Sequence, residues 1–179
     1  KMYDRIAGIV SNQLKRIEEL LSEKEQDFSE RLKKIVVYNA YIKRRSNLEF
    51  LRESENKIST GELYTSISES IGYLKLNDIE TSIIFDVDGD MSVDAAILAY
   101  DFFEVVVETV LSRASMLSIN LTEKDGNFYL RMLTDTSDST FIDDWKCDEF
   151  KSCHGKIDKI ENDKDSIFVL SFEKGGVEA

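Results

Sequence analysis

The chain has 179 residues, enough for one sizeable domain or for a helical element joined to an α/β domain. Hydrophobic residues make up 42% of the sequence and charged residues 32%, so the chain can bury a core and wholesale disorder is not expected. The formal net charge of -12 opposes binding to nucleic acid, whose phosphates attract clustered Lys and Arg. A protein or small-ligand partner is expected instead.

No apolar run approaches the length of about 20 residues that spans a bilayer. The chain begins inside a helical pattern without Met, which predicts a piece of a longer protein and leaves an upstream membrane anchor open. Two cysteines, Cys147 and Cys153, form no disulfide framework and suit a reducing, cytoplasmic location. Together with His154 they lack a fourth ligand and match no common zinc spacing, so no metal site is predicted.

Two amphipathic helices open the chain. Apolar residues recur at helical spacing from Met2 to about Glu23, and the period restarts after a charged break and runs from Phe28 to about Ser54. This pattern predicts an antiparallel helical hairpin. Two helices form a single layer and cannot bury their apolar stripes alone, so the hairpin is predicted to form a homodimeric four-helix bundle. The alternative is that its helices pack on the rest of this chain.

Residues 55–62 break the helical pattern and predict a boundary between a hairpin domain, residues 1–57, and an α/β domain, residues 58–179. The acidic stretch 85–94 lacks the spacing of a calcium loop and is predicted to be a solvated turn. The second domain is predicted to contain a helix, a strand, a helix, a strand pair, a short helix and a strand pair, at residues 63–74, 81–87, 92–114, 116–134, 145–152 and 156–172. The predicted fold class is α+β, with a mixed sheet covered on one face.

This order of elements resembles the catalytic half of a sensor histidine kinase over nearly the whole chain. The resemblance implies a dimerisation and phosphotransfer hairpin followed by an ATPase-type domain related to gyrase-like ATPases. It also implies ATP and Mg²⁺ as cofactors, a response regulator as partner and a role in two-component signalling. Whether kinase activity is kept depends on the individual motifs.

The phosphoacceptor motif is the first of these. In one branch of the family it reads His, an acid, any residue, an aliphatic and a small residue, and this chain reads Tyr3-Asp4-Arg5-Ile6-Ala7. Asp4 fits the acid, whereas Tyr3 stands where the resemblance requires the nucleophilic histidine. A phenol with an ordinary pKa near 10 does not replace an imidazole that attacks phosphate at neutral pH. No catalytic residue is therefore predicted, and a chance Tyr-Asp pair on a first helical turn is the alternative.

The resemblance places nucleotide contacts at Glu104, Glu108 and Asp135. Kinases of the family carry Glu, three residues and then Asn, which helps hold Mg²⁺; here Glu104 matches the first position and Glu108 replaces the Asn. A carboxylate can bind Mg²⁺ but also repels a triphosphate. Asp135 matches the Asp of the family's Asp-x-Gly-x-Gly motif, and both glycines are lost at residues 137 and 139. A degenerate nucleotide site is the expectation.

Lys43, Arg44 and Arg45 form the only dense basic cluster of this acidic chain. They are predicted either to be a solvated helix face or to dock an acidic surface, on a response-regulator receiver or on the α/β part of the same chain. The expected function is the signalling portion of a sensor-histidine-kinase-like protein with impaired or absent autokinase activity. A non-catalytic pseudokinase and an anti-sigma-like protein-binding module are the alternatives.

Overall fold

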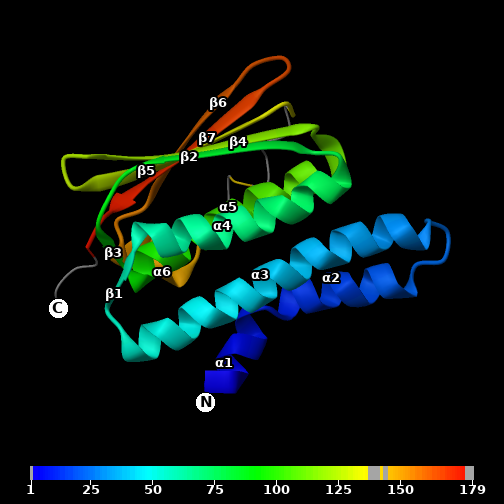
Figure 1. The fold of residues 1–179 in the computed structure, drawn as a ribbon, viewed down its shortest axis with the longest axis horizontal. Coiled ribbons are helices and arrows are strands. Elements are labelled where there is room, and N and C mark those ends of the chain that lie inside the picture. The colour runs from blue at the N-terminus through cyan, green and yellow to red at the C-terminus, as the bar shows by residue number, and fades with distance from the viewer. Residues whose placement is uncertain (1, 137–141, 143–144, 176–179) are drawn as a thin grey trace.

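The computed structural model describes residues 2–136, 142 and 145–175 (Figure 1). Its helices are α1 (Met2–Ile9), α2 (Ser11–Ser22), α3 (Phe28–Ser54), α4 (Thr60–Leu74), the 3-10 turn η1 (Lys75–Asn77), α5 (Val93–Arg113) and α6 (Asp148–Ser152). Its strands are β1 (Lys57–Ser59), β2 (Glu80–Asp86), β3 (Asp90–Ser92), β4 (Met116–Lys124), β5 (Asn127–Thr134), β6 (Lys156–Glu161) and β7 (Ser166–Glu173). In the part of the chain that is described, no helix has the length and apolar character needed to cross a bilayer.

Five strands form one mixed sheet in the order β2-β4-β5-β7-β6, in which only β2 and β4 run parallel. Figure 1 shows α4 and α5 covering one face of this sheet, with the hairpin of α2 and α3 forming a further layer against these helices. The predicted α+β fold is confirmed, with a helical hairpin followed by a mixed sheet covered on one face.

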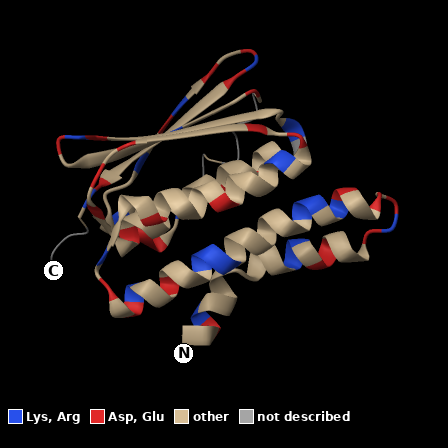
Figure 2. Cartoon of the chain, in the orientation of Figure 1, with Lys and Arg blue, Asp and Glu red and all other residues tan. Residues whose placement is uncertain are grey.

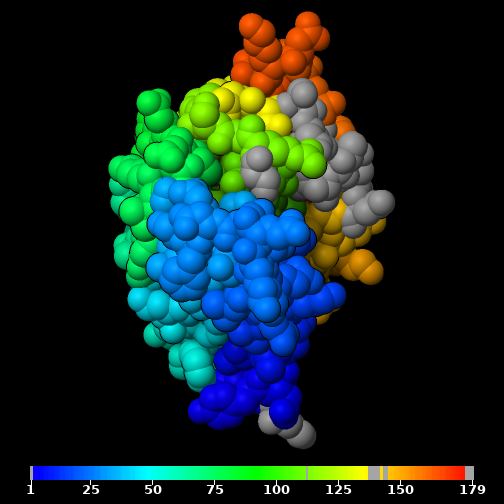
Figure 3. Space-filling view, turned by 90° about the vertical axis from the view of Figure 1, so that its right-hand side faces the viewer, coloured from blue at the N-terminus to red at the C-terminus, as the bar shows by residue number. Residues whose placement is uncertain are grey.

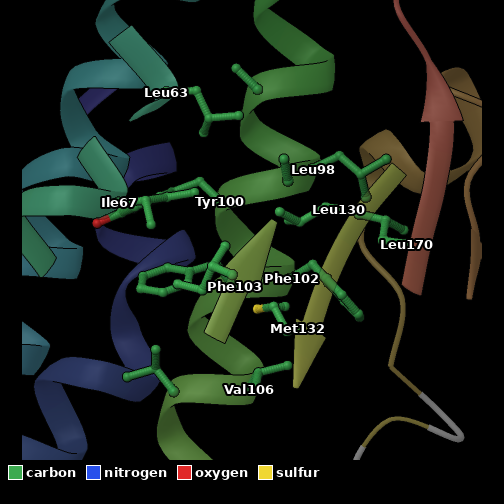
Figure 4. Packing of buried hydrophobic residues seen from close by; sticks show 14 of the residues in the cluster. Leu63, Ile67, Leu98, Tyr100, Phe102, Phe103, Val106, Leu130, Met132 and Leu170 are labelled. Atoms are coloured by element: carbon green, nitrogen blue, oxygen red, sulfur yellow. The ribbon is translucent and has the colours of Figure 1, made fainter. Parts of the chain in front are cut away.

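Helix α5 lies at the centre of these layers and is apolar almost all round, because it contacts the sheet on one side and α3 and α4 on the other. Side chains of α4, α5 and the strands meet in one cluster (Figure 4). The strands supply it by strict alternation, as in β7, where Phe168, Leu170 and Phe172 point inward. The position of α5 decides which of its polar residues are buried.

The hairpin packs on the rest of the chain through α3. Its inward face is apolar and buried, and the ring of Tyr41 stacks on that of Tyr100 of α5, with centroids 5.7 Å apart. The sequence left open that the hairpin helices pack on the rest of the same chain, and α3 does so. The four-helix bundle of two chains remains a prediction.

The first predicted helix, Met2 to Glu23, is divided in the structure at Val10 into α1 and α2, and Figure 1 shows α1 turning away from the axis of α2. Three features favour the bend. Val10 is drawn into the core with 3% of its surface exposed, Gly8 weakens the helix before it, and the Ser11 hydroxyl donates to the Gly8 carbonyl at 2.8 Å. The prediction of one continuous helix was wrong at this point.

A second correction concerns the boundary segment and the acidic turn. Residues 57–59 and 90–92 pair as the antiparallel strands β1 and β3, with buried Ile58 opposite buried Met91. Three-residue strands carry too short a pattern to be predicted by alternation. The pair joins the end of the hairpin to the start of α5, because the Val93 amide also donates to the carbonyl of Asn56 at 3.1 Å.

Candidate functional site

A cavity of about 770 Å³ lies where the hairpin, α5 and the segment preceding α6 meet. Figure 3 shows the hairpin (blue) lying against the α/β part, with the segment around α6 (gold) beside it. Charged side chains line most of the cavity; the acids are Glu19, Asp101, Glu104, Glu108, Asp148 and Glu149, and the bases are Arg5, Lys15, Arg16, Arg45 and Lys146. Trp145 and Tyr41 add aromatic surface.

Glu104 is the most unusual of these residues. Its side chain is 2% exposed, and neither carboxylate oxygen has a hydrogen-bond partner among the described residues. Burial raises the pKa of Glu104 well above its ordinary value, and the charges of Glu108 and Asp101 raise this pKa further. A carboxyl group is thus held at the cavity wall with spare acceptor capacity.

Glu108 lies one turn further along α5 and is engaged by the hairpin. Gln13 Nε2 donates to its Oε1 at 3.0 Å, and Arg16 Nε lies 3.8 Å from its Oε2. Glu108, which the resemblance sets at the position of a Mg²⁺-binding Asn, is therefore covered by α2 of the same chain.

Asp101 lies one turn before Glu104 and connects α5 to α3. Its Oδ1 accepts hydrogen bonds from the Tyr41 hydroxyl at 2.9 Å and from Arg45 Nε at 2.8 Å. Burial raises the pKa of Asp101 to about 6, although Arg45 acts in the opposite direction. Sequence reasoning missed Asp101, because its partners lie 56 and 60 positions away and no local pattern marks them.

The basic cluster of α3 turns toward the acids of its own chain, and Figure 2 shows this blue segment beneath α4 and α5. Lys43 Nζ lies 2.9 Å from Glu69 Oε1 of α4, and Arg44 pairs with the same carboxylate. Arg45 is 3% exposed and pairs with Glu49 at 2.8 Å as well as with Asp101. Of the acidic surfaces considered, the α/β part of the same chain is the one in contact; docking to a separate partner stays a prediction, for which Lys43 keeps an exposed side chain.

Asp135 does not lie at the cavity. Its carboxylate accepts hydrogen bonds from the backbone amides of Ser115 at 2.9 Å and Met116 at 3.0 Å, and thereby ties the end of β5 to the start of β4. Burial works to raise the pKa of Asp135, but these hydrogen bonds prevail and lower it. The structure brings Glu104 and Glu108 together and leaves Asp135 elsewhere. The two lost glycine positions lie at residues 137 and 139, outside the described residues.

Tyr3 and Asp4 lie on the first turn of α1, and Tyr3 has 76% of its surface exposed. Neither residue lines the cavity. Among the described residues, Cys147 forms a possible metal-ligating group with Asp101 and Glu149, whereas Cys153 and His154 belong to no such group. The set Cys147, Cys153 and His154 weighed from the sequence is therefore not assembled.

The described lining of the cavity lacks the glycine-rich backbone that cradles the phosphates of a nucleoside triphosphate. Phosphates are bound by backbone amides of glycine-rich loops or helix N-termini and by free Lys or Arg. No glycine occurs among the described lining residues, and the buried side-chain atoms there without partners, both oxygens of Glu104 and Oε1 of Gln13, are acceptors. Ionised carboxylates repel phosphate, whereas the Lys and Arg side chains of the same lining attract it.

No protein-family model matches the chain, and no curated protein sequence does. Solved structures are similar in fold. The histidine kinase domain of the blue-light activated histidine kinase of Erythrobacter litoralis EL346 has a TM-score of 0.59 at 9% identity, covering 92% of this chain and 96% of that one. A bacterial phosphotransferase has a TM-score of 0.53 at 11% identity, covering 94% and 93%.

A third similar structure is the histidine kinase ThkA in complex with the response regulator protein TrrA, with a TM-score of 0.52 at 11% identity. It covers 99% of this chain, which spans 62% of that kinase. At such identities the likeness establishes the fold alone. The chain has the fold of a sensor histidine kinase, with the helical hairpin and the ATPase-type sheet in the same order.

Proposed function

We propose that this chain, which has the sensor-histidine-kinase fold, is a signalling module of a two-component system that has lost autokinase activity and acts by binding protein partners. A non-catalytic pseudokinase is the form we favour. One observation carries the proposal: the described lining of the cavity beside α5 has buried acids and no glycine, and α2 covers Glu108.

The phosphoacceptor end of the hairpin supports the same reading. Tyr3 is accessible, but a phenol is a poor nucleophile toward phosphate at neutral pH. An autokinase needs a phosphoacceptor and a pocket for the phosphate donor. In this chain both the residue at the acceptor position and the lining of the cavity differ from what the resemblance implies for an active kinase. Signalling without phosphotransfer requires a partner, and the complex of ThkA with its response regulator makes a receiver domain the partner class we propose.

Nucleotide binding is the direct test of the lost activity. We expect millimolar Mg-ATP to leave the thermal unfolding midpoint unchanged, whereas a working pocket at 100 times its Kd would add about 2.7 kcal/mol of stability. Incubation with γ-labelled ATP should leave the chain unlabelled, with a histidine kinase that keeps its motifs as positive control. Transfer of label to the chain, or a saturable rise in its midpoint, would contradict the proposal.

Dimerisation through the hairpin is the second part of the proposal. Apolar side chains remain exposed toward its closed end, at Leu14, Leu21, Phe28 and Leu32, with 45% to 58% of their surfaces accessible. Leu14 and Leu21 are seven residues apart on α2, and Phe28 and Leu32 are four apart on α3, so each pair shares one helix face. A second copy would cover these stripes in a four-helix bundle.

We expect the double variant Leu21→Glu and Phe28→Glu to be monomeric where the unmodified chain is a dimer, measured by light scattering over a range of concentrations. The matched control replaces Ile84 by Glu, an equally exposed apolar residue on the sheet, and should remain dimeric. A monomer mass for the unmodified chain that does not change with concentration would reject the dimer.

A further inference from the structure

The buried side-chain atoms that line the cavity and lack hydrogen-bond partners are all oxygens. Among the described residues these are both carboxylate oxygens of Glu104 and Oε1 of Gln13, and both side chains are at least nine-tenths buried. A buried acceptor without a donor lowers the stability of the folded state. Native proteins therefore seldom keep one unless a bound cation or donor interacts with it. The cavity is therefore suited to a cation or a hydrogen-bond donor.

A second observation identifies the kind of cation. One carboxylate oxygen of Asp101, the Sγ atom of Cys147 and one carboxylate oxygen of Glu149 all lie within 4.8 Å of one another. In a tetrahedral zinc site neighbouring ligand atoms are roughly 3.5 Å apart, a separation that side-chain rotation can reach from here. All three residues line the cavity, so an ion and water have access to them.

The thiol of Cys147 favours a metal ion over an organic amine as the ligand of this site. Sulfur is a weak acceptor for N–H groups but a strong ligand for zinc and similar transition metals, whereas Mg²⁺ and Ca²⁺ prefer oxygen alone. The carboxylates are already held in place, since Arg45 binds Asp101 and Arg52 Nη1 lies 2.7 Å from Glu149 Oε1. Such outer partners orient first ligands in protein metal sites.

We propose that Asp101, Cys147 and Glu149 bind a divalent transition-metal ion of the zinc type at the wall of the cavity, where the unpartnered carboxyl group of Glu104 is available to accept hydrogen bonds from water on the ion. Glu104 is three residues from Asp101 on α5, so the two side chains lie on the same helix face. The ion would connect α5 to the segment before α6. This site goes beyond the proposed signalling function and does not depend on nucleotide.

Zinc binding by the full, reduced chain tests the proposal. After removal of metal with a chelator, equilibrium dialysis against Zn²⁺ alone should give one ion per chain, and Co²⁺ alone should give a thiolate-to-metal charge-transfer absorption. Cys147→Ser should abolish this absorption and weaken Zn²⁺ binding by more than about 100-fold, because loss of an outer partner alone costs about 10–100-fold. Glu104→Gln should weaken binding by about 10–100-fold, as for loss of an outer partner.

The control is Cys153→Ser, which removes the other buried thiol and should keep both the stoichiometry and the Co²⁺ absorption. Circular dichroism of each metal-free variant establishes that it is folded. Absence of stoichiometric Zn²⁺ on the unmodified chain, equal binding of Mg²⁺, or a Co²⁺ absorption that survives Cys147→Ser would each overturn the site. The Zn²⁺ stoichiometry is measured on the unmodified chain, so this test does not depend on whether any variant folds.

Discussion

Replacing Arg45 by Met is expected to lower the free energy of unfolding by about 3–5 kcal/mol, the range for removing one member of a buried ion pair. The Arg45 side chain is 3% exposed and lies 2.8 Å from both Asp101 and Glu49, whose side chains are themselves 13% and 1% exposed. Met fills a similar volume and leaves Asp101 without a guanidinium in a poorly solvated place, with the Tyr41 hydroxyl still donating to it, whereas Glu49 keeps Arg5 at 2.8 Å. Urea denaturation at neutral pH measures the loss.

Lys43→Met provides the matched control, since Lys43 belongs to the same basic cluster but has 60% of its side chain exposed. We expect its effect to stay within about 1 kcal/mol, as for exposed ion pairs. A loss below about 1 kcal/mol for Arg45→Met would show that the α3–α5 ion pairs are not structural. The same pair of variants separates folding from recognition, because weaker binding to a receiver domain after Lys43→Met alone would support a docking surface.

Replacing Glu104 by Gln is expected to stabilise the chain at neutral pH, by on the order of 1–3 kcal/mol, because Gln has no ionisable group whose pKa burial must raise. The folded pKa of Glu104 lies well above the ordinary value of 4.5 that the unfolded chain shows. Below pH 4.5 both states are protonated and Glu104 costs nothing. As pH rises above this value the unfolded state loses its proton first, so stability falls until the folded pKa is passed.

The gap between Glu104→Gln and the unmodified chain should therefore widen from about pH 5 toward pH 8 in metal-free buffer. Asp101, whose pKa burial raises to about 6, adds a decline of its own to both proteins. Thermal or urea unfolding across this range measures the gap. Parallel stability curves for the two proteins would contradict the raised pKa of Glu104.

The long elements could be predicted because each repeats its pattern over several turns or alternations, as α5 and β7 do. The strands β1 and β3 could not, since three residues contain too little pattern. The bend at Val10 was missed for a different reason: its cause is burial of Val10 against other elements, while the apolar spacing continues through it. The local sequence shows the periodicity of an element but not which other elements pack against it.

The candidate site shows the same limit. Three consecutive basic residues on a helix project in different directions. The side chains of Lys43, Arg44 and Arg45 are accordingly 60%, 24% and 3% exposed. Lys43 and Arg44 meet at Glu69, whereas Arg45 turns inward to Asp101. Glu104 and Glu108 were singled out because the resemblance supplied a motif whose two members are four residues apart on one helix. The grouping of Asp101 with Cys147 depends on how α5 meets the segment before α6, which no spacing in the sequence encodes.

Helix α3 also has a consequence for the cavity. It extends for 27 residues, about 40 Å, and contacts α4, α5 and η1 along that length. Arg45 joins it to Asp101 of α5, and Arg52 near its last turn binds both Asp94 at the start of α5 and Glu149 of α6. The hairpin is thereby linked by ion pairs to both ends of the cavity wall, without a contribution from the sheet.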